Sequence, residues 1–272
     1  VIATSAMTQV LLDGLGYKTK QTSASQQIIF AGIRDQRLDL FLGYWNPLMT
    51  QTITPFVEAK QVTVLAEPSL KDARATLAVP TYLADKGLKT FADIARFEKE
   101  LGGKIYGIEP GSGANTQIKA MIAKNQFGLG KFQLVESSEA GMLAAVDRAV
   151  RRKEAVVFFG WAPHPMNVNV QMTYLSGSED ALGPNEGMAT VWTVTTPTYA
   201  EQCPNVHKLL TNLTFTAADE SRMMQPLLEH KDAFESARQW LKDHPQDQQR
   251  WLEGVTTFDG KPAADNLKLT SK

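Results

Sequence analysis

Apolar positions along the chain follow two different spacings, which predicts an α/β protein. Met7, Val10 and Leu11 stand three and four residues apart, as on one face of a helix, and Gly14 follows as a stop. Ala155–Phe159 is instead a short, wholly apolar run of the length of a buried strand. Because such runs alternate with helical stretches, we expect parallel sheets with helices on both faces.

The same spacings predict the individual elements. In the first part of the chain they predict helices over 6–14 and Ala24–Asp35, strand-like residues at Lys18–Lys20, and a buried parallel strand at Leu38–Leu42. In the middle they predict strands at Lys104–Ile108, Phe132–Val135 and Ala155–Phe159, with helices at Asn115–Asn125 and Ser138–Arg152. From Asn205 to Trp251 the pattern is mostly helical, with segments at Ala217–Leu228 and Asp232–Asp243 and Pro245 as a breaker.

Two short extended stretches bracket the middle third of the chain, near Ala75–Val79 and Thr190–Val194. Two crossings between lobes make the middle third an insertion into the first lobe. We therefore expect a two-lobed clamp, with residues 1–75 and 191–272 in lobe I, which holds both termini, and residues 76–190 in lobe II.

Charge, hydrophobicity and cysteine content argue against nucleic acid as a partner, a membrane span and a cysteine-based metal site. The chain has 28 basic and 29 acidic residues, so it lacks the surplus of cations that binding to nucleic acid requires. No apolar stretch approaches the roughly 18 residues of a membrane span. Cys203 is the only cysteine, which excludes a disulfide within this sequence and a thiolate metal cluster.

Motifs for catalysis are scarce. The four histidines form no HExxH or HxH pattern, and the chain has no GxSxG elbow, P-loop or GxGxxG. We therefore expect no enzyme, no metal and no cofactor. A small-molecule enzyme stays open as an alternative if His164 or Glu186 has a strongly shifted pKa and a partner near Trp161. A structural or interaction protein stays open if the tryptophans are buried and no cleft separates the lobes.

Two tryptophans occur in the same local context. Leu40–Pro47 (LFLGYWNP) and Val157–Pro163 (VFFGWAP) each run from an apolar strand through glycine to tryptophan and end at proline. Ligands of open α/β sheets bind beyond the carboxyl ends of the strands, so we expect Trp45 and Trp161 at a ligand site, one in each lobe. Core packing of both rings is the alternative. Indole faces attract cations, quaternary ammonium groups above all.

The other aromatic residues are weaker candidates for ligand contact. Trp192 lies at the second predicted crossing and is a candidate third wall, with Tyr44 beside Trp45 as a further candidate. Trp240 and Trp251 fall in the helical C-terminal part, where we expect them in the core.

A glycine-containing turn, Glu109–Asn115 (EPGSGAN), leads directly from a predicted strand into a predicted helix. The free backbone N–H groups of such a helix start suit a carboxylate or hydroxyl oxygen of a ligand. The candidate residues are Gly111, Ser112, Gly113 and Asn115. Alternatively, Ser112 is only the N-cap of the helix.

Several blocks of sequence, taken in order, resemble the periplasmic choline-binding proteins of bacterial ABC importers. They include FLGYWNP at Phe41–Pro47, GKIYGIEPG at Gly103–Gly111, VESSEAGML at Val135–Leu143 and FFGWAPHPMN at Phe158–Asn167. The resemblance covers nearly the whole chain and extends to the wider quaternary-amine group of binding proteins. It implies a two-lobed fold with two crossovers, a periplasmic location, a membrane permease as partner, and a monomer that captures a quaternary ammonium compound.

The resemblance also implies roles for single residues. Trp45 and Trp161 match two tryptophans of the family's aromatic box, whereas a third tryptophan and a first strand are expected upstream of Val1, as is a signal peptide. A cysteine in that upstream segment is the implied partner of Cys203. Ala75, preceded by Arg74, stands at the family's hinge tyrosine and Ser112 stands at its asparagine. Carnitine and glycine betaine are therefore alternatives to choline.

Overall fold

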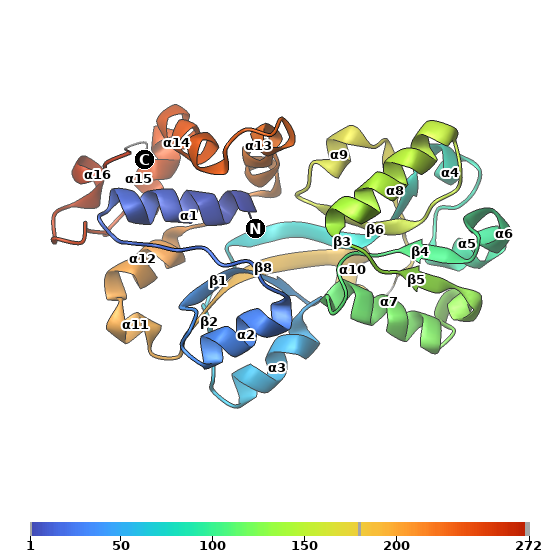
Figure 1. The fold of residues 1–272 in the computed structure, drawn as a ribbon, viewed down its shortest axis with the longest axis horizontal. Coiled ribbons are helices and arrows are strands. Elements are labelled where there is room, and N and C mark those ends of the chain that lie inside the picture. Colours follow the sequence, from blue (N-terminus) through green and yellow to red (C-terminus); the bar gives the residue numbers. More distant parts are fainter. Residues whose placement is uncertain (1, 179–180, 270–272) are drawn as a thin grey trace.

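The computed structural model describes residues 2–178 and 181–269, which form helices packed around one mixed sheet (Figure 1). The strands are β1 Leu40–Asn46, β2 Thr63–Val64, β3 Leu70–Pro80, β4 Lys104–Tyr106, β5 Gln133–Val135, β6 Phe158–Ala162, β7 Met172–Tyr174 and β8 Met188–Thr195. The longer helices are α1 Ile2–Gly14, α2 Gln26–Arg34, α3 Thr50–Glu58, α7 Gly113–Ala123, α8 Glu139–Arg152, α12 Pro204–Asn212, α13 Ala217–Leu228, α14 Ala233–Asp243 and α15 Pro245–Trp251. The short helices are α4 Thr81–Asp85, α5 Phe91–Ile94, α6 Glu98–Leu101, α9 Met166–Asn169, α10 Pro184–Gly187, α11 Tyr199–Gln202 and α16 Ala263–Asn266, with 3₁₀ turns at Ala95–Phe97 and Gln126–Lys131.

Two long strands, β3 and β8, connect the two ends of the molecule. The order across the sheet is β1-β8-β3-β6-β4-β5, with β2 also paired to β8 and β7 to β3. Figure 1 shows α1, α2, α3 and the C-terminal helices at one end and α4 to α9 at the other, with β3 and β8 running between them. The two predicted crossings, Ala75–Val79 and Thr190–Val194, both fall in these two strands.

Strand direction differs from the sequence-based expectation at Leu38–Leu42. The strand there begins at Leu40 and pairs antiparallel with β8, Leu40 opposite Thr195, whereas a parallel strand was predicted. Among the described residues, parallel pairing joins only β4 to β5 and to β6, besides isolated bridges. The sheet is therefore mainly antiparallel, and the expectation of parallel sheets was wrong. The predicted burial is not found either, because Asp39 is exposed and Leu40, Phe41 and Leu42 are only half-buried. A short run rich in apolar residues carries no information on the direction of its neighbour.

The predicted strand at Lys18–Lys20 does not form. This stretch forms neither helix nor strand and lies in the connection from α1 to α2. Side chains hold it in place instead of a ladder: Thr19 Oγ1 donates to Asp13 Oδ1 at 2.7 Å, and Gln9 Nε2 donates to the Thr19 carbonyl at 3.5 Å. The connection is therefore held against α1 without strand pairing.

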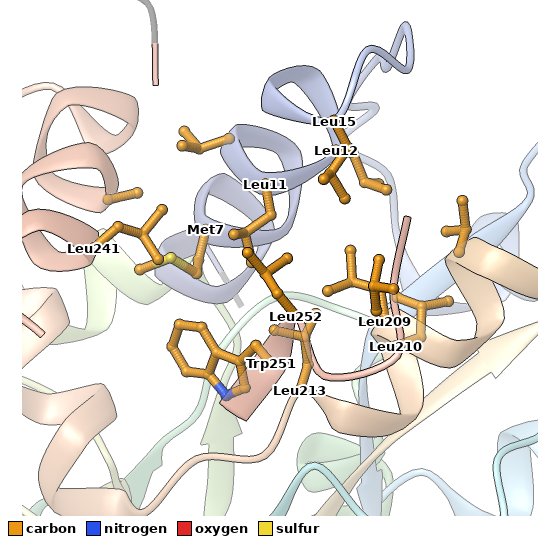
Figure 2. Close-up of a cluster of buried hydrophobic side chains, with 14 of the residues drawn as sticks. Met7, Leu11, Leu12, Leu15, Leu209, Leu210, Leu213, Leu241, Trp251 and Leu252 are labelled. Carbon is orange, nitrogen blue, oxygen red and sulfur yellow. The ribbon is translucent and has the colours of Figure 1, made fainter. Parts of the chain in front are cut away.

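Two large apolar clusters stabilise the two ends of the molecule. One joins α1 to the C-terminal helices, and Figure 2 shows Met7 and Leu11 of α1 close to Trp251 and Leu252. Trp240 and Trp251 are 8% and 1% exposed, which confirms both as core residues. The other large cluster gathers side chains from residues 48–182, most of them in the middle third. The chain thus encloses separate cores on either side of the β3–β8 pair.

The helical predictions hold well away from the sheet. Ala217–Leu228 and the end of the first helix at Gly14 are confirmed, and α8 begins one residue after its Ser138 N-cap. Cys203 is a free, half-buried thiol, so its pairing with an upstream cysteine stays a prediction. None of the helices described is long and apolar enough to cross a membrane.

Candidate functional site

The strands that carry Trp45 and Trp161 end near the same point along the central β3–β8 pair. β1 is antiparallel to β8, and Asn46 at its end lies opposite Thr190. β6 is antiparallel to β3, and Ala162 at its end lies opposite Arg74, which itself faces Met188 of β8. Because β3 and β8 are antiparallel, β1 and β6 run in opposite directions. Their carboxyl ends therefore point toward each other at the centre of the molecule.

The two tryptophans share their immediate surroundings as well as their sequence context. Each is followed, one residue later, by a cis peptide bond to proline, Asn46–Pro47 in β1 and Ala162–Pro163 after β6. Both rings are only partly buried, and both pack against the apolar cluster of the middle third. The structure thus brings the two predicted residues to one region and leaves part of each ring accessible.

Neighbouring side chains fix the ring of Trp161. The Phe159 ring stacks on it with centroids 5.6 Å apart, and the imidazole of His164 lies 4.6 Å away on a tilted plane. His164 is buried, and its Nδ1 accepts the Met166 N–H at 3.0 Å, so the ring hydrogen lies on Nε2, 2.9 Å from Glu139 Oε1. This hydrogen bond holds the pKa of the Glu139 carboxyl below its ordinary value. Both ring nitrogens are engaged, so the His164–Glu139 pair orients Trp161.

A chain of polar contacts ties the end of β6 to the crossing strand β3. Asn167 Nδ2 donates to the Trp161 carbonyl at 2.8 Å, and its Oδ1 accepts the Tyr174 hydroxyl at 2.7 Å. The Arg74 guanidinium lies 5.0 Å from the Tyr174 ring centre, and Arg74 Nε donates to the Glu186 carbonyl at 2.8 Å. Burial raises the pKa of Tyr174 to about 12. Arg74, a candidate from the sequence, therefore braces the crossing.

The turn before α7 uses its polar side chains internally. Ser112 and Asn115 are each 1% exposed, and Ser112 Oγ accepts the Asn115 N–H at 3.2 Å as the N-cap. The Asn115 Nδ2 group donates to the Ile108 carbonyl at 2.9 Å, to the Glu109 carbonyl and to Glu136 Oε1. Asn115 Oδ1 accepts the Ile108 N–H at 3.0 Å. Hydrogen bonds within the protein therefore account for both side chains, as in the alternative in which Ser112 is only the N-cap. A ligand oxygen at this turn would bind backbone N–H groups.

Gly111 and Gly113 differ in their surroundings. Gly111 is exposed, has φ +82°, and no atom outside its neighbours lies within 4 Å of where a Cβ would stand. Gly113 is buried, and its N–H donates to Gln26 Oε1 at 3.2 Å. Gln26 comes from α2, at the opposite end of the molecule from most of the middle third, and no sequence motif marked it.

The weaker candidates Tyr44 and Trp192 lie opposite each other in the β1–β8 pair and line a different pocket. This pocket, of about 270 Å³, opens beside α3. Its other lining residues are Asn46, Ile53, Thr54, Val57, Glu58 and Val64, without Trp45 or Trp161. Alternation along the strand explains the division, since successive side chains point to opposite faces of a sheet.

The residues that sequence reasoning missed are Gln26, Asn167 and Tyr174. Asn167 stands in the quoted FFGWAPHPMN block, so that block was a usable signal, whereas the role of Tyr174 depends on pairing between β3 and β7. No group of three or more His, Cys, Asp or Glu side chains able to hold a metal occurs in residues 2–178 and 181–269.

Comparison with known proteins gives consistent results. Residues 1–243 match the family described as the substrate binding domain of ABC-type glycine betaine transport systems. A solved choline-binding protein of an ABC transporter, in complex with choline, is 43% identical, with 99% of this chain and 94% of that chain covered and a TM-score of 0.95. The unliganded, semi-closed form of such a protein is 43% identical, with 100% and 95% covered and a TM-score of 0.89.

Two more distant proteins are also similar, one by sequence and one by structure. The glycine betaine/carnitine transport binding protein of Listeria monocytogenes is 29% identical over 177 residues, which are 64% of this chain and 57% of that protein. The lactococcal glycine betaine protein in its closed, liganded form is 23% identical, with 92% of this chain and 94% of that chain covered and a TM-score of 0.83. These similarities confirm the two-lobed α/β fold expected from the sequence.

The family match and the two-lobed fold agree in placing this chain in a transport family. The chain belongs to the substrate-binding domains of ABC-type glycine betaine transport systems.

Proposed function

We propose that this protein captures a quaternary ammonium compound, choline foremost, between its two lobes and delivers it to the membrane permease of an ABC importer. Lobe I comprises residues 1–75 and 191–272 and lobe II residues 76–190, and the protein acts as a monomer in the periplasm. The supporting observation is the approach of the β1 and β6 carboxyl ends, each with a partly accessible tryptophan.

The indoles of Trp45 and Trp161 supply the affinity in this proposal. A trimethylammonium group donates no hydrogen bond, so the negative face of an indole is the group that best replaces its hydration. Each face contributes about 0.5–2 kcal/mol, more when water is excluded. His164, Phe159 and Asn167 hold Trp161 in place before the ligand arrives, so little ordering is needed on binding.

The polar end of the ligand distinguishes choline from carnitine and glycine betaine. Choline carries a hydroxyl, whereas the other two carry a carboxylate that suits the backbone N–H of Gly111 and the guanidinium of Arg74. Arg74 already stacks on Tyr174 and donates to Glu186, so its role in bracing the crossing competes with binding a carboxylate. For this reason we place choline first.

Tryptophan fluorescence and calorimetry with choline, carnitine and glycine betaine test the proposal. Binding should shift or quench the emission, and choline should bind more tightly than the two carboxylates. Ethanolamine, which keeps the hydroxyl and lacks the methyl groups, is the matched control and should give no response. Absence of binding by all three quaternary amines would refute the proposed function.

A further inference from the structure

The first turn of α7 lies against the loop that follows β1 at a distance that only glycine permits. A Cβ on Gly113 would stand 2.0 Å from the Leu48 carbonyl oxygen and 2.7 Å from its carbonyl carbon. The obstacle is backbone, which cannot rotate away as a side chain does. Gly113 has no positive φ, so glycine is required here by the contact and not by its own conformation.

Further contacts join α7 to this loop and to α2. Gln26 of α2 accepts the Gly113 N–H at 3.2 Å, and Gln117 Nε2 of α7 lies 3.5 Å from the Leu48 carbonyl oxygen. The side chain of Leu48 is 7% exposed and is part of the apolar cluster that contains Ala114 and Ile118 of α7. The loop after β1 is therefore seated in the core of the middle third.

Every one of these contacts crosses the proposed boundary between the lobes. Gln26 and Leu48 belong to lobe I, whereas Gly113, Ala114, Gln117 and Ile118 belong to lobe II. Trp45 lies three residues before Leu48 on the same segment. A contact that brings Leu48 onto α7 thus also carries Trp45 toward lobe II.

We propose that Gly113 is a positioning residue for lobe closure: its missing side chain lets the Leu48 loop and Gln26 dock on α7, and this contact stabilises the closed state. The inference rests on the proposed function, because closure matters only if a ligand is held between the lobes. Measured affinity then equals intrinsic affinity multiplied by the fraction of closed molecules that the contact allows.

Gly113→Ala is the decisive variant. Alanine has a higher helix propensity than glycine, so the unliganded protein should unfold at the same or a higher temperature. The affinity for choline should nevertheless fall at least about tenfold, with faster dissociation and an association rate close to that of the wild type. Small-angle X-ray scattering at saturating choline should show a larger radius of gyration than for the wild type.

Gly141→Ala is the matched control, because Gly141 lies in the first turn of α8 in the same lobe. The atoms nearest to a Cβ there would be side-chain atoms of Ser137 and Ser138, both in lobe II, at 3.1–3.3 Å. It should leave the affinity unchanged. Gln26→Ala removes one hydrogen bond and should weaken binding by less than Gly113→Ala.

The outcomes separate the two proposals. If the wild type binds choline and Gly113→Ala binds it equally well, the closure proposal is overturned and the proposed function stands. If the wild type binds no quaternary amine, the proposed function fails. Scattering of the unliganded proteins then decides closure, since Gly113→Ala must be more extended than the wild type. Loss of stability together with affinity in Gly113→Ala would also overturn the proposal.

Discussion

In the proposed site, each of the two indole rings, Trp45 and Trp161, should contribute separately to the affinity for choline. We expect Trp45→Ala and Trp161→Ala each to weaken choline binding at least about tenfold, which is about 1.4 kcal/mol. The double variant should fall short of additivity because both rings contact one cation. Calorimetry on purified variants measures the loss.

Trp240→Ala is the control for these variants. This ring is 8% exposed, stacks on His244 with centroids 3.7 Å apart, and lies in the apolar cluster that joins α1 to the C-terminal helices. The substitution should lower the melting temperature and leave the affinity of the folded protein nearly unchanged. A Trp161→Ala variant that binds as tightly as the wild type would contradict the aromatic site.

A buried carboxyl gives a second prediction at the scale of one residue. Glu220 of α13 is 7% exposed, and burial raises the pKa of its carboxyl, as does the neighbouring Asp72. The folded state therefore holds this proton to higher pH than the unfolded chain, and its contribution to stability is lost as pH rises above the ordinary value.

Glu220→Gln removes that dependence. The variant should be more stable than the wild type at pH 7, and the two should converge near pH 4, where the wild-type carboxyl is protonated in both states. Denaturant titrations at several pH values give the comparison. A variant that is less stable than the wild type at pH 7 would show that the charged carboxylate is stabilising.

At the scale of one helix, Ser112 tests how α7 begins. Its hydroxyl accepts the Asn115 N–H, so Ser112→Ala should lower the free energy of unfolding by about 0.5–2 kcal/mol. Thr116→Ala on the same helix, whose hydroxyl only donates back to the Ser112 carbonyl, is the control and should have a smaller effect. An affinity loss for Ser112→Ala without a loss of stability would instead make Ser112 a ligand contact.

Helices were predictable from the sequence because their signals are local. The i, i+3, i+4 spacing and the caps identify α8 and α13 almost to the residue. The direction of β1 was not predictable, since it depends on pairing with β8, about 150 residues later. The local repeat of Gly, Trp and Pro indicated Trp45 and Trp161. The contact of Gln26 and Leu48 with Gly113 exists only in the assembled fold, so no local pattern could reveal it.

For the whole molecule, ligand binding should appear as added stability. A ligand that binds only the folded protein adds about 2.7 kcal/mol to the free energy of unfolding at a concentration of 100 times its dissociation constant. Choline should therefore raise the melting temperature in a concentration-dependent manner, while ethanolamine at the same concentration should not. Equal shifts with the two compounds would show that the trimethylammonium group is not recognised.

The pairing of β3 with β8 has a consequence for how such proteins diversify. Because Ala73 lies opposite Ala189, the chain enters and leaves the middle third at almost one point in space. A segment whose ends meet can be exchanged between relatives without rethreading the remainder. A chimera that carries residues 76–190 of a carnitine-binding relative should therefore fold cooperatively and acquire that relative's preference through its share of the site. Ligand specificity could then change through exchange of this one segment, without changes in the part of the chain that holds both termini.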